Sequence, residues 1–181
     1  LTEGSVGVAA SVTDAAGNTG TSDSLSFTYD AKAPAAPTLS MNSDGTIEVA
    51  GLESGASWSY TLDGGDAVTG SDTSITMTNS GSYVLSVSQT DASGNAGSAA
   101  TANVVVGTTG DDKIAGTSSV ELINLNGGTD TVTLSSGDTV SGFTSGDAID
   151  LSVLLGPGSG AGYTTENSVP AGSASSPYEF R

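Results

Sequence analysis

The sequence of 181 residues contains no cysteine and no histidine. Without these side chains, thiol catalysis, zinc sites built on imidazole or thiolate, and Ser-His-Asp catalysis are excluded, so we expect a protein that is not an enzyme. The absence of cysteine is compatible with secretion, provided that something other than disulfides stabilises small domains. No apolar run approaches the length of a membrane span, and we expect no membrane insertion.

Basic residues are almost absent as well, because only Lys32, Lys113 and Arg181 oppose 20 acidic side chains, which gives a net charge of −17. Nucleic acid and anionic membrane surfaces are poor partners for such a chain. Two interpretations of the charge remain, a coat that keeps the protein soluble or a chain that folds in millimolar calcium. We favour calcium, because the carboxylates lie in glycine-containing turns and Ca²⁺ takes hard oxygen ligands.

A repeat of domain length organises the chain. Residues 13–20 (TDAAGNTG) and 90–97 (TDASGNAG) agree at six of eight positions and lie 77 residues apart (90 − 13). An alternating strand pattern precedes each copy and a second one follows it. Such a repeat is typical of an array of like modules, and the 26 glycines among alternating runs predict an all-β fold.

Residues 1–37 predict a hairpin followed by a linker. Two strands, near 6–13 and 22–29, are too few to fold alone, so we expect the last two strands of a preceding Ig-like module, completed by upstream strands or by another chain. Pro34 and Pro37 among alanines favour an extended connection between modules. The strand pattern begins at once, with no signal peptide, and we interpret the chain as a segment of a longer protein.

Residues 38–106 predict an Ig-like β-sandwich. Its seven strands are expected near 38–42, 46–50, 57–62, 66–69, 74–78, 82–90 and 99–106. Apolar residues alternate on the third and sixth strands, and a facing layer comes from Ile47, Val49, Ile75 and Met77. We expect Trp58 in this thin core rather than in a ligand site.

Strand parity predicts a calcium site at the junction between linker and sandwich. If successive strands run alternately away from the linker and back, three loops return to it, and their acidic or amide residues meet the start of the linker. The members of this predicted site are Asp30, Glu53, Asp91 and Asn95, with Asp72 in the remaining loop. The alternative is that Asp91-x-x-Gly94-Asn95 is only a favourable hairpin turn, because these residue types suit turns in any case.

After Val106 the period changes to nine residues. The nonapeptides 107–115, 116–124 and 125–133 place an acidic residue sixth and an aliphatic residue eighth, namely Asp112, Glu121 and Asp130 and then Ile114, Ile123 and Val132. Residues 127–132 keep most of the spacing of G-G-x-G-x-D-x-U-x, in which the aspartate binds calcium and the aliphatic residue fills a β-roll. We expect calcium at Asp111, Asp112 and Asp130, with a plain β-solenoid rung as the alternative.

The end of the chain carries weaker patterns. Residues 139–155 predict a capping strand or strand pair that completes a region spanning 107–155. Residues 156–181 are rich in glycine, serine and alanine, and we expect a flexible tail.

Two sets of these motifs resemble the RTX adhesins, which are large repetitive bacterial surface proteins secreted by type I systems. The T-D-x-x-G-N-x-G hairpin, followed by D-x-x-A-P-x-x-P over residues 30–37, is similar to their bacterial Ig-like extender repeats. The patterns G-x-x-G-D-D-x-I-x-G-T over 107–117 and F-x-x-G-D-x-I-D-L-S over 143–152 are similar to their C-terminal RTX ends. Together these motifs cover most of residues 4–155.

The resemblance implies a stalk of Ig-like modules, stiffened by calcium at their junctions and followed by a short RTX-like β-roll near a secretion region. The implied function is a non-enzymatic structural and adhesive segment of a secreted protein at the bacterial cell surface. Its partners would be neighbouring modules, with any host, sugar or cell-surface ligand bound by other parts of the parent protein. The second hairpin lacks the D-x-x-A-P linker, so we expect the Ig-like array to stop at Val106.

Two other functions remain open from the sequence. One is a subunit of an extracellular filament that self-assembles when the hairpin adds to a neighbouring sheet. The other is the accessory C-terminal region of a type I-secreted hydrolase, whose catalytic domain would lie upstream.

Overall fold

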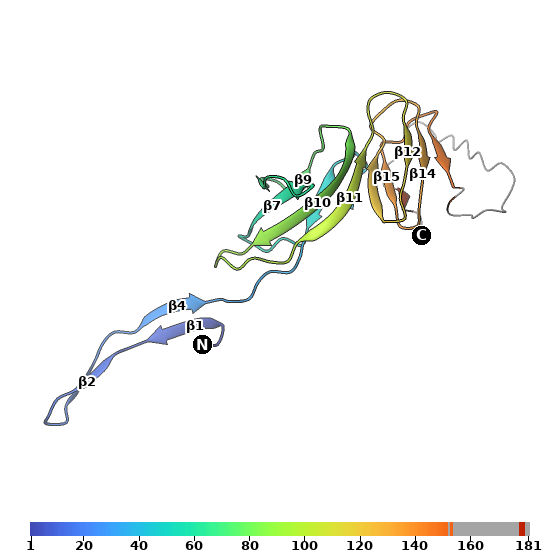
Figure 1. The fold of residues 1–181 in the computed structure, drawn as a ribbon. Helices are drawn as coiled ribbons and strands as arrows, with labels where there is room; N and C mark the ends of the chain where they lie inside the picture. The colour runs from blue at the N-terminus through green and yellow to red at the C-terminus, as the bar shows by residue number, and fades with distance from the viewer. Residues whose placement is uncertain (152, 154–177, 180–181) are drawn as a thin grey trace.

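The computed structural model describes residues 1–151, 153 and 178–179, and every element bounded within them is a β-strand (Figure 1). The expected all-β fold is confirmed. No helix in this described part of the chain is both long and apolar enough to cross a membrane.

An extended hairpin projects from the rest of the molecule at the N-terminal end (Figure 1). Its strands are β1 (Gly4–Val8), β2 (Ser11–Thr13), β3 (Thr19–Thr21) and β4 (Leu25–Tyr29). Strand β1 is antiparallel to β4 and β2 is antiparallel to β3, so the expected hairpin is confirmed. Its apolar side chains belong to neither hydrophobic core, and Leu25 is 71% exposed.

The linker between the hairpin and the next strand packs against the two sheets formed by residues 38–106, which we call the sandwich. Residues 30–37 form no strand, as predicted, but Pro34 and Pro37 are buried. The backbone of Pro34 lies so close to Gly97 that a Cβ added to that glycine would come within 2.6 Å of the Pro34 carbonyl oxygen. Residue 97 must therefore be a glycine, because the linker passes directly over it.

All seven strands expected between residues 38 and 106 form. They are β5 (Thr38–Met41), β6 (Ile47–Ala50), β7 (Ser57–Leu62), β8 (Val68–Thr69), β9 (Ser74–Ile75), β10 (Gly81–Thr90) and β11 (Ala100–Val106). One sheet has the order β5-β6-β9, and β8-β7-β10-β11 belong to another. Side chains of both sheets meet in one core that includes Ile47, Trp58 and Leu85, which confirms the predicted position of the tryptophan.

After β11 the chain alternates between two sheets. Strands β12 (Lys113–Ala115), β14 (Thr131–Thr133) and β16 (Ala148–Asp150) form a parallel sheet. Strand β13 (Glu121–Asn124) is parallel to β11, and β15 (Thr139–Ser141) is parallel to β13. Paired positions are 18 residues apart from β12 to β14 (131 − 113) and 17 apart from β14 to β16 (148 − 131). We call the stretch between two strands paired in the same sheet a circuit, so the first circuit has the length of two nonapeptides and the second is one residue shorter.

The expectations for the C-terminal part are met only in part. Two strands form within 139–155, but β15 and β16 belong to different sheets and do not pair with each other. Strand β17 (Tyr178–Glu179) is antiparallel to β15. The rest of the predicted flexible tail, like residues 154–155, lies outside the described residues.

The sandwich and the following region share one sheet. Strand β11 is antiparallel to β10 and parallel to β13, which gives a seven-stranded sheet of order β17-β15-β13-β11-β10-β7-β8. Leu122 of β13 is buried in the sandwich core, and Val105 of β11 packs against the second core. The predicted boundary at Val106 is thus the end of a strand, but hydrogen bonding and packing continue across it.

Because the sheet is continuous, a cavity in the second core is expected to destabilise the sandwich as well. Ile123 is fully buried in the second core, and Ile123→Ala should lower the free energy of unfolding by about 2–5 kcal/mol. In a denaturant titration followed by Trp58 fluorescence, the midpoint should shift although Trp58 lies in the other core. Val120→Ala is the control, because Val120 is 58% exposed. An unchanged Trp58 midpoint for Ile123→Ala would show that the two regions unfold independently.

Candidate functional site

The turn between β10 and β11 contacts the start of the linker, as strand parity predicted. The Nδ2 atom of Asn95 donates to the carbonyl oxygen of Asp30 at 3.2 Å, and the Ser93 hydroxyl donates to the Asp30 carboxylate at 3.4 Å. Asp91 lies in the same turn and bonds Asn95. Asp30, Asp91 and Asn95 are therefore brought together although more than 60 residues separate the linker from the turn.

A buried amide completes this junction. Gln89 is 1% exposed, and its Nε2 atom donates to the carbonyl oxygens of Ala35 (2.9 Å) and Gly51 (3.0 Å). Its Oε1 atom accepts the backbone N–H of Glu53 at 2.9 Å. The predicted site residue Glu53 thus reaches the junction, but through its backbone.

Gln89 was not predicted from the sequence, although a pattern pointed to it. It follows Leu85 and Val87 on the inward face of β10, where alternation calls for an apolar residue. A polar side chain at a core position needs hydrogen-bond partners, and here these come from the linker and from a loop that follows β6.

The Asp91 carboxylate is used inside its own turn. Its Oδ1 atom accepts the backbone N–H groups of Ser93 and Asn95, both at 2.8 Å, and its Oδ2 atom accepts Asn95 Nδ2 at 2.8 Å. Asp14 makes the same three bonds to Ala16 and Asn18 in the first copy of the repeat. Hydrogen bonds from the asparagine side chain and backbone lower the pKa of both aspartates. The turn alternative accounts for these contacts without a metal ion.

The carboxylates do not converge on a metal-binding geometry through their side chains alone. Among the described residues, no group of three or more Asp, Glu, His or Cys side chains lies close enough to hold a metal ion. Asp72 bonds the neighbouring Ser71 hydroxyl at 3.3 Å. A calcium ion at the junction would therefore need backbone oxygens and water for most of its ligands.

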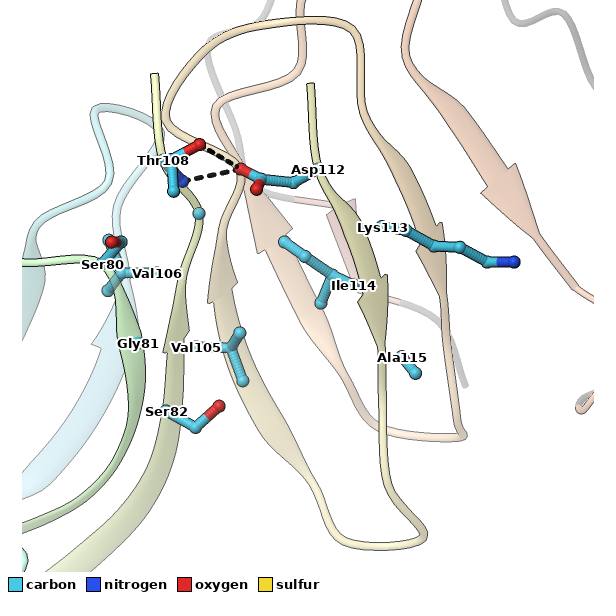
Figure 2. A pocket seen from close by; sticks show the side chains of 11 residues that line it. Ser80, Gly81, Ser82, Val105, Val106, Thr108, Asp112, Lys113, Ile114 and Ala115 are labelled. Atoms are coloured by element: carbon cyan, nitrogen blue, oxygen red, sulfur yellow. Dashed lines mark hydrogen bonds between the residues drawn. The ribbon is translucent and has the colours of Figure 1, made fainter. Parts of the chain in front are cut away.

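The region after β11 contains a second set of acidic residues with a shared geometry. Each of its five connections between strands has an acidic residue as its last residue or as the first residue of the next strand. At four of them, a serine or threonine three or four positions earlier donates to that carboxylate. The pairs are Thr108 with Asp112, Thr117 with Glu121, Ser135 with Asp138 and Thr144 with Asp147. Figure 2 shows the first pair, in which the backbone N–H and the hydroxyl of Thr108 donate to Asp112 at 2.7 and 3.0 Å.

These acids also bond one another's backbone from one circuit to the next. The N–H of Asp112 donates to Asp130 Oδ1 and the N–H of Asp130 to Asp147 Oδ1, both at 2.8 Å. We call these three residues the first acidic column. Alternate turns form the second acidic column, in which the N–H of Glu121 donates to Asp138 Oδ1 at 2.9 Å. The carboxylates therefore hold successive circuits in register.

Asp138 and Asp147 were not predicted as site residues. The repeat was present, because residues 135–140 (SSGDTV) and 144–149 (TSGDAI) share the S-G-D-x-aliphatic pattern. Asp138 follows Asp130 by eight residues, not nine (138 − 130), so a strict nine-residue period misses it.

Asp130 is the exception in the first acidic column. Asn126 stands where the other turns have serine or threonine, and it donates to the carbonyl oxygen of Gly107 at 3.4 Å. Asp130 is 1% exposed, and its Oδ2 atom is buried without a hydrogen-bond partner among the described residues. Burial raises the pKa of Asp130, and the charges of Asp147, Asp112 and Asp111 raise it further.

The predicted calcium ligands Asp111, Asp112 and Asp130 lie in adjacent turns. Asp112 donates its N–H to Asp130, and the Asp111 carboxylate accepts the N–H of Thr129 at 2.8 Å. A buried carboxylate oxygen with no partner, surrounded by negative charge, fits a bound cation. No protein-family model matches the chain, and no curated protein sequence matches it.

A groove of about 370 Å³ lies beside Asp112, between the start of β10, the end of β11 and β12 (Figure 2). Ser80, Thr108 and Ile114 line it, and the Lys113 side chain extends away from it. Asp112 is the one acidic side chain among its lining residues, and its Oδ2 atom accepts two bonds from Thr108. The groove offers no acid–base pair, and we assign it no reaction.

Gln89→Leu is expected to destabilise the junction. The substitution leaves the carbonyl oxygens of Ala35 and Gly51 and the N–H of Glu53 without their partner, at a cost of about 2–3 kcal/mol in the free energy of unfolding. Equilibrium denaturation followed by Trp58 fluorescence measures this loss. Ser88→Ala is the matched control on the opposite face of β10, and an equal loss in both variants would contradict the role of Gln89.

Asp91→Asn is expected to flatten the acid limb of the stability curve. The pKa of Asp91 is lower in the folded chain than its ordinary value of 3.8. Its contribution to stability is therefore present above pH 3.8 and is lost as the pH falls through the folded pKa. Thermal unfolding between pH 2 and 6, followed by Trp58 fluorescence, tests this. Asp14→Asn is the control, because its turn makes the same bonds outside both cores; it should leave the Trp58 transition unchanged.

Proposed function

We propose that this chain is a non-enzymatic, calcium-stabilised structural segment of a secreted bacterial surface protein. The observation that carries the proposal is the buried, unpartnered Oδ2 atom of Asp130, with Asp112 and Asp147 above and below it in the first acidic column. A buried negative charge without a partner is costly. A divalent cation at this atom would remove that cost and offset the repulsion within the column.

The finer architecture is part of the same proposal. Residues 38–106 form an Ig-like β-sandwich, and residues 107–151 form a short β-roll whose acidic turns lie at its two edges. The alternating parallel strands support the roll, because each circuit contributes one strand to each sheet. In this proposal, the free Oδ2 atom of Asp130 binds calcium together with backbone oxygens and water, and the adjoining Asp111 and Asp112 add negative charge around the ion without all three carboxylates binding it directly.

A stalk function follows from how the parts are joined. The buried Pro34 and Gln89 fix the linker on the sandwich, and β11 fixes the sandwich on the roll. A bending or twisting force along the chain therefore acts on packed sheets and not on free tethers. Extracellular calcium modules bind with dissociation constants of about 10⁻⁴–10⁻³ M, so such a chain stays weakly folded in the cytosol and folds after export.

Calcium at millimolar concentration is expected to raise the melting temperature of the chain, and Asp130→Asn is expected to abolish that increase. Without calcium, Asp130→Asn should be at least as stable as the parent chain, because a buried charge is removed. The sign follows from the pKa of Asp130, which is raised: the ionised carboxylate destabilises the fold above that pKa, and the cost disappears as the pH falls. Calorimetry with calcium and with excess chelator measures both effects.

The matched control is Asp138→Asn in the second acidic column. Both oxygens of Asp138 accept hydrogen bonds, from Glu121 and Ser135, so the amide must lose an acceptor. This variant should be less stable than the parent with and without calcium, and its calcium response should remain. A melting temperature of the parent chain that does not change between calcium and chelator would reject the calcium site.

A further inference from the structure

The N-terminal hairpin and the hairpin of β10 and β11 have the same register. Each Cα pair of β1 and β4 has a counterpart 77 residues later in β10 and β11: Val6 lies opposite Phe27 as Tyr83 lies opposite Val104. The correspondence continues into the turns, where Thr13 pairs with Thr19 and Thr90 with Ala96. The two segments are therefore one structural unit found in two environments.

The N-terminal hairpin has one apolar face and one polar face. Residues directly opposite in an antiparallel pair share a face, so Val6, Val8, Leu25 and Phe27 lie on one side and Ser5, Gly7, Ser26 and Thr28 on the other. The apolar face is open: Val8 is 53% exposed and Phe27 is 45% exposed. Their counterparts, Leu85 and Val104, are both 0% exposed.

The sandwich shows what covers the counterpart face. Strands β5, β6 and β9 supply the opposing layer of the core, and β7 pairs along the edge of β10, with Leu62 opposite Leu85 and Tyr60 opposite Val87. Among the described residues, β1 has no partner on the edge that corresponds to this one. The apolar face and the adjoining strand edge are thus both open in the N-terminal hairpin.

A glycine in the N-terminal hairpin leaves room for a linker like the one that crosses the sandwich. Gly97 must be a glycine because the linker residue Pro34 crosses it, with the carbonyl oxygen 2.6 Å from an added Cβ. The counterpart of Gly97 is Gly20 (97 − 77), where an added Cβ meets only Val12, at 4.0 Å. Space for a crossing proline is therefore present at Gly20, although no linker occupies it among the described residues.

We propose that the apolar face of the N-terminal hairpin is the docking surface for the first five strands of a β-sandwich module and the proline-containing linker that leads into them. The partner's strands alternate β-branched or aromatic residues with polar ones, as residues 38–80 do. A second copy of this chain does not meet this need, because its sandwich already contains its own β10 and β11. This proposal goes beyond the proposed function and does not depend on calcium.

At one position, the hairpin has an apolar side chain where its counterpart is polar. Val12, which is 73% exposed, stands where the sandwich has the buried Gln89. The partner must therefore meet an apolar side chain where the linker and the loop after β6 meet an amide. A partner module that is completed by this hairpin will therefore differ from residues 34–80 at the contacts with Val12.

The test adds a copy of residues 34–80 to the full chain, directly before Gly4 and in place of residues 1–3, because the same offset places Ser80 before Gly81. The chain also carries Val12→Gln, which supplies the partner of the added copy, and Trp58→Phe at the original position. The one tryptophan then lies in the added strands. We expect its emission to shift to the blue, and exchange of the β1 and β4 amides to slow by about 100-fold or more.

Two further chains set the limits of the signal. The extended chain with Val8→Asp should keep a solvent-exposed tryptophan, because a charge replaces an apolar contact at the centre of the face. The extended chain with Val6→Tyr, Val8→Leu, Leu25→Ala and Phe27→Val carries the side chains of β10 and β11, and it defines the emission of a completed module. A buried tryptophan in this chain but an exposed one with the natural face would overturn the proposal.

Sedimentation of the unmodified chain tests the choice of partner. Monomers up to high concentration support a partner that lacks its own last hairpin. A dimer or filament that Val8→Asp dissolves would overturn the proposal in favour of a second copy as the occupant. Neither result bears on the calcium site, because all chains are compared at the same millimolar calcium concentration.

Discussion

The structure depends on the two-sided pairing of β11. This strand is antiparallel to β10 on one edge and parallel to β13 on the other. One sheet therefore includes strands of both the sandwich and the parallel-stranded region that follows it. Leu122 from the parallel-stranded region is buried in the sandwich core, and Val105 from the sandwich packs against the second core. Two thin cores that would each be small are thereby stabilised together, and the connection between them cannot swing without breaking a sheet.

Carboxylates supply the second constraint, as acceptors for backbone N–H groups in turns that have few other partners. Asp14 and Asp91 accept backbone N–H groups in the two copies of one hairpin turn. The acidic columns do the same in the turns of the parallel-stranded region. This use explains how a chain with a net charge of −17 keeps its acids near one another: most of the carboxylate oxygens described above accept hydrogen bonds. Asp130 departs from the pattern because Asn126 replaces the hydroxyl residue, and that departure singles it out as the place for a cation.

Much of the fold could be predicted because its signals are local. Alternation identified the strands of the sandwich, and Asp-x-x-Gly-Asn identified both hairpin turns. The parity of the strands even placed Asp30, Asp91 and Asn95 together. The parts that escaped prediction depend on spacing or on distant contacts. A circuit one residue short concealed Asp138 and Asp147, and the partners of Gln89 lie 36 to 54 residues away along the chain.

The sequence by itself determined the strands, the turns and the excess of acidic residues, because each of these follows from neighbouring side chains. Only the tertiary structure decided what the acids do. Asp112 and Asp130 are 18 residues apart, and a bond between them exists only once the parallel strands fix the register of successive circuits. In the same way, the sequence made the two hairpins alike, but packing decided that Leu85 is buried and Val8 exposed, since burial depends on which strands lie across the face.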